Sequence, residues 1–221
     1  MVEMNDFCEL KSRQRDERHT YPDNLSLRVH RSLSWLKKAE LSQGDHDAHF
    51  IFLWIAFNSA YANNVDKAYR LGEHQLFDKF IDKLCKLDKQ GLLSELVWQE
   101  FAGAIRVLLD NEYVFQPFWD YQNGYATEQQ WKFRFKQAKS RAHKAMGQED
   151  TAAILAVIFD RIYTLRNQII HGGATYDSKV NRDQMRDCCH LMSKLVPAII
   201  EIMMDNPHTL WGQPCYAVVS D

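Results

Sequence analysis

Apolar residues recur at helical spacing along almost the whole chain, and this pattern limits the fold more than any other feature. No stretch alternates apolar and polar residues over several positions, as a half-buried strand would. Glycine and proline are few, 9 and 5 in 221 residues, and they cluster between the periodic segments. The chain is therefore predicted to be all-α, an up-and-down helical bundle with additional helices.

The helix ranges follow from the apolar periodicity and from the turn signals between the periodic segments. The segment 46–63 is apolar almost all round, which is typical of a buried central helix, and Asp45 or Asp47 can cap it. The segment 111–123 contains Pro117 and indicates an irregular, packed connection. The aromatic side chains expected in the core include Trp35, Trp54, Phe57 and Tyr61. The predicted helices are 25–41, 46–63, 73–88, 91–110, 127–146, 149–171 and 179–205.

The length of the chain suits one domain, and 46% hydrophobic residues are enough for a sizeable core. Three parts are expected: a polar N-terminal segment over 1–24, a single helical domain over 25–206 and a C-terminal tail over 207–221. The formal net charge is −2, so any site for a nucleic acid must be a local patch.

The cysteines suit a reduced, cytoplasmic protein. They are odd in number, two of them are adjacent, and none has the spacing of a metal site. The first twenty residues are polar and charged, so no secretory signal is expected. The longest apolar run, 50–57, is too short to span a bilayer, so no membrane association is expected. The five cysteines are Cys8, Cys85, Cys188, Cys189 and Cys215.

The helix predicted over 149–171 has an arginine within its apolar side. Its main apolar stripe repeats every three or four residues, and further apolar residues widen it. Arg166 projects into the widened sector, where a guanidinium needs a carboxylate, a phosphate or a subunit boundary beside it. The stripe consists of Ile154, Ile158, Ile162, Leu165 and Ile169.

The same helix is expected to end at a histidine. Gly172 and Gly173 are a strong C-terminal signal, which places His171 in the last turn. Histidine exchanges protons near neutral pH, so His171 is a candidate general acid or base beside a phosphate clamp at Arg166. Residues five apart on an ideal helix project about 140° from one another. Either the helix loosens at its end, or a second copy of the chain completes the site.

These residues resemble the HEPN superfamily, and most closely its prokaryotic Apea-like branch. The motif is Arg166-Asn167-Gln168-Ile169-Ile170-His171, an arginine, a polar residue and a histidine after four intervening positions. The segments 34–40 (SWLKKAE) and 47–58 (DAHFIFLWIAFN) are similar to the first two helices of that bundle. The resemblance covers about 25–205 and implies a HEPN-like helical bundle.

The resemblance implies an endoribonuclease that needs neither metal nor cofactor. Arg166 would bind the scissile phosphate, His171 would move protons, and Asn167 would orient the histidine or the substrate, with the ribose 2′-hydroxyl as nucleophile. The implied partners are RNA, a second copy through the motif-bearing helix, and an antitoxin or another protein of an antiviral defence system. The alternative is a non-catalytic HEPN module that binds RNA, a nucleotide or a protein partner. A plain helical scaffold is the third possibility.

A second group of basic residues lies on the helix predicted over 127–146, on both flanks of an apolar seam. It is a candidate RNA-binding surface, because lysine and arginine supply most phosphate contacts. The competing interpretation is a solvated helix face whose long side chains cover the seam. The candidate residues are Lys132, Lys136, Lys139, Arg134 and Arg141.

Overall fold

The computed structural model describes residues 6–62, 73–179 and 182–216, and every regular element within them is a helix. This confirms the predicted all-α class. The chain divides into two compact units, Met1–Leu92 with Cys189–Asp221, and Leu93–Cys188. The helix α10 (Arg182–Asp205) starts in the second unit and ends in the first.

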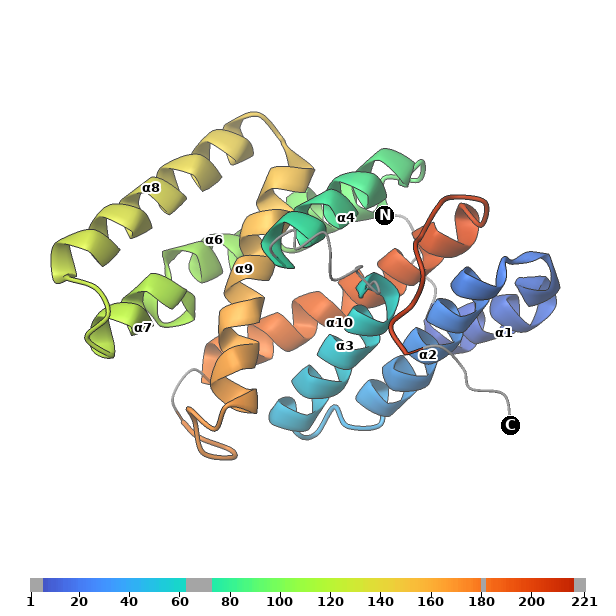
Figure 1. Ribbon diagram of the computed structural model, residues 1–221, viewed down its shortest axis with the longest axis horizontal. Helices are drawn as coiled ribbons and strands as arrows, with labels where there is room; N and C mark the ends of the chain where they lie inside the picture. The colour runs from blue at the N-terminus through green and yellow to red at the C-terminus, as the bar shows by residue number, and fades with distance from the viewer. Residues whose placement is uncertain (1–5, 63–72, 180–181, 217–221) are drawn as a thin grey trace. The chain divides into compact units, whose positions relative to one another are not determined.

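Four α-helices, the short 3₁₀ helix η1 (Arg18–Thr20) and the end of α10 form the described part of the first unit. The helices α2 and α3 pack side by side along their length (Figure 1). The buried residues of α3, such as Phe50, Leu53 and Phe57, lie on one side of the helix, and the opposite side is only partly buried, so α3 is not buried all round as its nearly continuous apolar sequence predicted. The predicted last residue of this helix, 63, lies outside the described residues. The four helices are α1 (Phe7–Glu17), α2 (Asp23–Glu40), α3 (His46–Tyr61) and α4 (Glu73–Leu87).

Aromatic rings fill the core between α3, α4 and the segment after α10. Phe57 stacks on Tyr61 with 5.6 Å between ring centroids, and Phe80 meets Trp211 edge-on at 6.3 Å. The prediction of core aromatic residues is confirmed for Trp54, Phe57 and Tyr61. It is wrong for Trp35, which is 37% exposed and stacks on Phe52 at the surface.

The polar segment before residue 25 contains a helix, α1, that apolar periodicity did not predict. Asp6 and Glu9 start it with a capping box, in which each side chain accepts a hydrogen bond from the backbone N–H of the other residue, both at 2.9 Å. Leu10 and Gln14 are its buried residues. The helix is therefore marked in the sequence by its cap rather than by an apolar stripe.

The segment after Pro207 forms no helix up to Tyr216, and it packs on the first unit through Trp211 and Gly212. Arg28 of α2, which is fully buried, donates hydrogen bonds to the carbonyls of Ala60 at 2.8 Å and Ala62 at 2.9 Å. Its guanidinium also reaches the Gly212 carbonyl at 3.4 Å. One arginine therefore holds the end of α3 and the C-terminal segment.

The acidic and histidine-rich segment 45–49 begins α3. Asp45 is the N-cap, and its carboxylate accepts a hydrogen bond from the Ala48 backbone N–H at 3.0 Å. This confirms the predicted capping role. Across residues 6–62, 73–179 and 182–216, no three or more histidine, cysteine or acidic side chains form a group that could hold a metal ion.

His49 lies in the first turn of α3 and is 5% exposed. Its Nδ1–H donates to the Ala39 carbonyl at 2.7 Å, close to the end of α2. Burial lowers the pKa of His49 below 6.5, although the hydrogen bond to Ala39 raises it in part, and nearby His46 lowers it further. The folded state therefore keeps His49 neutral where the unfolded chain binds a proton.

We expect the free energy of unfolding to fall as the pH is lowered through 6.5 toward the depressed pKa of His49. The stabilisation is complete above 6.5, and it is lost in this window because only the unfolded state takes up the proton. Chemical denaturation between pH 7.5 and 5.5 measures the slope. His49→Gln should flatten it, whereas the exposed His19→Gln should not. Equal slopes in both variants would contradict the assignment.

The second unit contains α5 (Leu92–Glu95) from its second residue, the π-helical turn η2 (Leu96–Glu100), α6 (Ala102–Asp110), η3 (Glu112–Val114), α7 (Gln116–Gln122), α8 (Glu128–Gly147) and α9 (Thr151–Ile170). α7 packs against α8, and α8 packs against α9. The aromatic residues of α7 and α8 meet here, with Phe118 edge-on to Trp131 at 5.2 Å. No helix of the described residues is long and apolar enough to cross a membrane.

Two predicted elements differ from the observed ones. The helix predicted over 91–110 is broken at Phe101, where the backbone N–H bonds to the Leu96 carbonyl five residues back and the wide turn ends. The connection predicted as irregular over 111–123 contains η3 and α7, and a proline in the first turn of α7 is compatible with a helix start. The other predicted helices begin and end within two residues of the observed helices. Two predicted bounds are exceptions: residue 63, which is not described, and the start at 179, which adjoins the undescribed residues 180–181.

Candidate functional site

The end of α9 has the geometry that its two glycines predict. His171 is the C-cap, and Gly172 follows with a φ of 70°, a conformation that glycine adopts without strain. The Gly172 N–H bonds to the Ile169 carbonyl at 3.1 Å, and the Gly173 N–H bonds to the Gln168 carbonyl at 2.7 Å. These two bonds form a Schellman motif, which leaves His171 exposed at the helix end.

Arg166 is half-buried on α9. Its Nη1 donates to the Asn167 side-chain oxygen at 2.8 Å, and its guanidinium lies over the Tyr163 ring at 5.8 Å from the centroid. These contacts give the side chain a preferred position, which a residue that clamps a phosphate needs. The side chains of Arg166 and Asn167, both predicted to belong to the site, are thus in contact.

His171 is not brought to Arg166 within one chain. The His171 N–H still makes the α-helical bond to the Asn167 carbonyl at 3.0 Å, so the loosened helix end allowed by the sequence is not observed. A regular helix between them separates the two side chains by about 140° around its axis. In the described part of the chain, the side chain of Asn167 bonds to Arg166 and not to the histidine ring.

The end of α9 is tied to the connection that precedes α7. Gln168 donates to the Tyr113 carbonyl at 2.7 Å, and Trp119 donates its indole N–H to the same carbonyl at 2.8 Å. The motif-bearing turn is therefore anchored to α7 through one shared backbone acceptor.

The basic residues predicted on α8 separate into two sets. Lys132, Lys136 and Lys139 line one hollow of about 490 Å³ on this helix, together with Trp131 and Phe135. Carboxylates already hold two of these lysines, because Lys132 pairs with Glu128 and Lys139 pairs with Asp110 at 2.8 Å. The predicted residues Arg134 and Arg141 are exposed and line neither this hollow nor the one that adjoins it.

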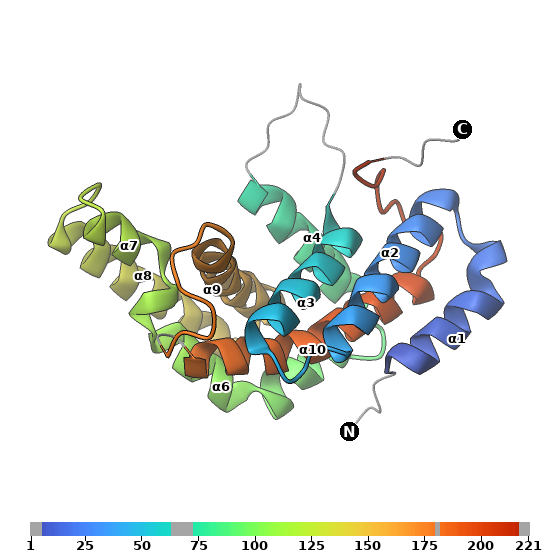
Figure 2. The ribbon, with the colours of Figure 1, turned by 90° about the horizontal axis from the view of Figure 1, so that it is seen from below.

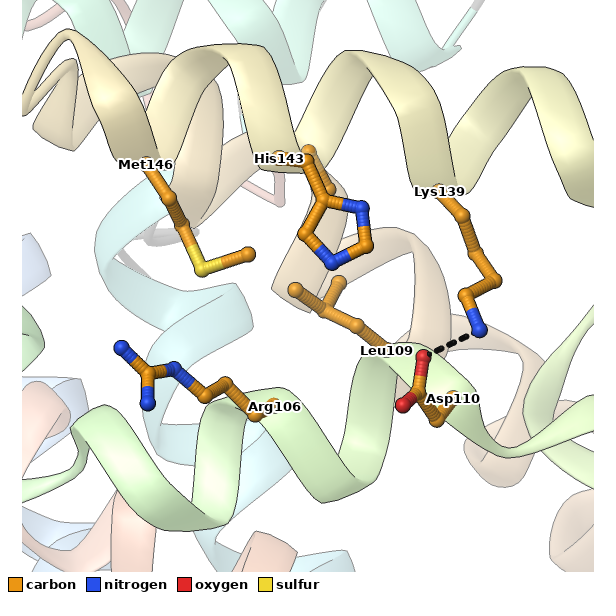
Figure 3. A pocket seen from close by; sticks show the side chains of 7 residues that line it. Arg106, Leu109, Asp110, Lys139, His143 and Met146 are labelled. Carbon is orange, nitrogen blue, oxygen red and sulfur yellow. Dashed lines mark ion pairs between the residues drawn. The ribbon is translucent and has the colours of Figure 1, made fainter.

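An adjoining hollow of about 320 Å³ lies between α6 and α8, and sequence reasoning did not single it out. Figure 3 shows Arg106 of α6 facing Met146 and His143 of α8, with the Lys139–Asp110 ion pair at the other end. Arg106 is exposed and escaped notice because it lies alone in an apolar segment. The charges of Arg106 and Lys139 are partly balanced by that of Asp110, so this hollow is only weakly positive.

The buried arginine of α9 is Arg161 rather than Arg166. It is 3% exposed, and its guanidinium lies 4.3 Å from the Phe115 ring centroid and 5.5 Å from that of Phe135. Burial lowers the pKa of Arg161 to about 10, against a smaller raising effect of Asp160. Its position could have been predicted, because it follows Ile158 by three residues and precedes Leu165 by four on the apolar stripe.

We expect Arg161→Met to raise the free energy of unfolding by about 1 kcal/mol, because methionine fills a similar volume without a buried charge. Arg161→Ala should lower it by about 3 kcal/mol, since it leaves a cavity and removes both ring contacts. Urea denaturation of the two variants measures both changes. If methionine destabilises as much as alanine, the ring contacts outweigh the cost of burying the charge.

No protein-family model, curated protein or solved structure matches this chain.

Proposed function

We propose that this protein is a metal-independent endoribonuclease of the HEPN type. The observation that carries the proposal is the end of α9, where a positioned arginine and an exposed histidine lie five residues apart at a sharply terminated helix. Arg166 is held by Asn167 and Tyr163, and it offers a guanidinium to a phosphate. His171 is open to solvent and can exchange protons with a substrate.

The proposed reaction needs only these groups, water and the RNA itself. A histidine removes the proton from the ribose 2′-hydroxyl, and the 2′-oxygen forms a bond to the adjacent phosphorus. The bond from phosphorus to the 5′-oxygen breaks, and that oxygen takes a proton from a water molecule. Arg166 stabilises the additional negative charge on the phosphate oxygens. The products are a 2′,3′-cyclic phosphate and a 5′-hydroxyl.

We further propose that two copies of the chain form the site. The separation of about 140° along a regular helix keeps Arg166 and His171 of one chain from meeting at one phosphate. A twofold arrangement through α9 would place the arginine of one copy near the histidine of the other.

Incubation of the purified protein with structured and single-stranded RNA in the presence of EDTA tests this function. The expected result is cleavage that leaves 2′,3′-cyclic phosphate ends, which are identified by their resistance to direct ligation and by mass. Cleavage that stops in EDTA, or products with 3′-hydroxyl ends, would overturn the proposed chemistry.

The alternative is a module that uses the same surface to bind RNA, a nucleotide or a protein without cutting. The separation of Arg166 and His171 in a single chain favours this reading if the chain is monomeric. RNA that is bound by the protein and recovered intact, together with a monomeric mass in solution, would support it over the nuclease.

A further inference from the structure

The helices α1 and α2 enclose a basic groove in the first unit, far along the sequence from the motif of α9. Figure 2 shows the two helices running side by side. The hollow between them has a volume of about 410 Å³. We name it the α1–α2 groove, and it is lined by Phe7, Cys8, Lys11, Arg15, His30, Ser34 and Lys37.

The spacing of the lining residues within each helix places their side chains on one face of that helix. Phe7, Lys11 and Arg15 follow one another at intervals of four on α1, so they share a face. His30, Ser34 and Lys37 are spaced by four and three on α2 and do the same. The groove therefore presents one continuous face of each helix.

The side chains that line the groove are basic or neutral, and an acidic group, Glu40, meets only the backbone N–H of Phe7. Lys11, Arg15 and Lys37 are basic, and no carboxylate is among the lining residues. In a chain whose formal net charge is −2, this is a local concentration of one sign. Burial lowers the pKa of Lys11, and repulsion from Arg15 and Arg18 lowers it further, so an anion placed here would stabilise the lysine.

A basic side chain on another face of α1 is neutralised, in contrast to those of the groove. Arg13, on another face, pairs with Glu17 at 2.9 Å and with Asp205 at 2.8 Å. In the groove, Lys11 donates to the neutral Gln14 side chain at 2.8 Å, and Lys37 lies over the Phe7 ring at 5.9 Å. Within residues 6–62, 73–179 and 182–216, Arg15 has no ion pair or hydrogen bond through its side chain.

We propose that the α1–α2 groove binds a phosphate group carried by a nucleotide, either free or within an RNA strand. An arginine fork and two lysines suit a phosphate, the Ser34 hydroxyl adds a donor, and Phe7 offers an aromatic surface to a base. The volume falls within the range of sites for small ligands, about 300–1,000 Å³. The proposal is independent of the nuclease function, because no residue of the groove belongs to the motif of α9.

Binding of ADP, inorganic phosphate and a ten-nucleotide single-stranded RNA to the full chain tests the proposal by titration calorimetry. The His171→Ala background is used for the RNA, so that cleavage cannot interfere. Lys37→Gln should weaken binding roughly tenfold, from the loss of one charged contact. Lys38→Gln is the matched control, since it removes the same charge from the next residue, which lies over Phe52 outside the groove. It should change binding less than twofold.

The exposed thiol of Cys8 allows occupancy of the groove to be measured by alkylation. Ligand in the groove should slow the alkylation of Cys8 by iodoacetamide and leave that of Cys215 unchanged. Binding of both ADP and RNA identifies the phosphate group as the ligand, and binding of RNA alone identifies the strand as its source. No binding of any probe, or equal losses in Lys37→Gln and Lys38→Gln, would overturn the proposal whether or not the protein cleaves RNA.

Discussion

Replacing His171 by alanine is expected to lower the rate of RNA cleavage by about 100- to 10,000-fold, the usual contribution of a group that moves protons. The affinity for RNA should change little, because the proposed phosphate contact comes from Arg166. The fold should also persist, since His171 is an exposed C-cap and its backbone, not its side chain, makes the helix-ending bonds. Initial cleavage rates under single-turnover conditions, with RNA binding measured alongside, check both expectations.

The exposed His208→Ala serves as the matched control for loss of a surface histidine. It should cleave at the wild-type rate. Arg166→Lys keeps the positive charge but loses the fork that contacts Asn167, so its cleavage rate should also fall, by about tenfold or more. A His171→Ala protein that retains full cleavage would exclude His171 from the chemistry and would point to a contaminating nuclease or to another site.

Mixing two inactive variants distinguishes a composite site from a site within one chain. In a mixed dimer of Arg166→Ala and His171→Ala subunits, one site combines the intact arginine of one subunit with the intact histidine of the other. Random exchange of subunits should therefore restore about a quarter of the wild-type activity. A mixture that remains as inactive as its components contradicts a site assembled in this way.

The sequence predicted the parts of the structure that depend on local signals. The end of α9 was predicted within one residue, because Gly172 can adopt the positive φ that a Schellman motif requires and few other residues can. Helices with a strong apolar pattern, such as α2, α8 and α9, were also located closely. A helix that buries only Leu10 and Gln14, as α1 does, has no such pattern, and it was not predicted, although its capping box is a local signal for a helix start.

Features that depend on distant parts of the chain were harder to predict. Arg161 lies on the same apolar stripe as Ile158 and Leu165, yet its aromatic neighbours Phe115 and Phe135 are 46 and 26 residues away in the sequence. The basic groove escaped notice for the same reason. Lys11, Arg15 and Lys37 are scattered among acidic residues along the chain, and only the pairing of α1 with α2 gathers them.

Replacing Arg28 by methionine is expected to lower the free energy of unfolding by about 3 kcal/mol, through acceptors that lose their donors. The Ala60 and Ala62 carbonyls lie at the end of α3, where no further helical N–H can reach them, and both accept hydrogen bonds from Arg28. The substitution also removes the contact with Gly212 that holds the C-terminal segment. In a chain of this size, the melting temperature should fall by roughly 6–12 °C.

An opposing effect limits this loss without cancelling it. Burial lowers the pKa of Arg28 to about 10, so its charged form carries a cost in the folded state that methionine would remove. The cost is outweighed because the guanidinium donates to three carbonyls among the described residues, two of them at short distance.

Arg31 is the matched control on the same helix. It donates to the carbonyls of Cys215 and Tyr216 at 2.7 and 2.6 Å, but it is only half-buried, and water can replace it. Arg31→Met should therefore cost about 1 kcal/mol or less. Equal losses in the two variants would contradict this account. They would show that Arg28 stabilises the protein through its contact with the C-terminal segment and not through its hydrogen bonds to the carbonyls at the end of α3.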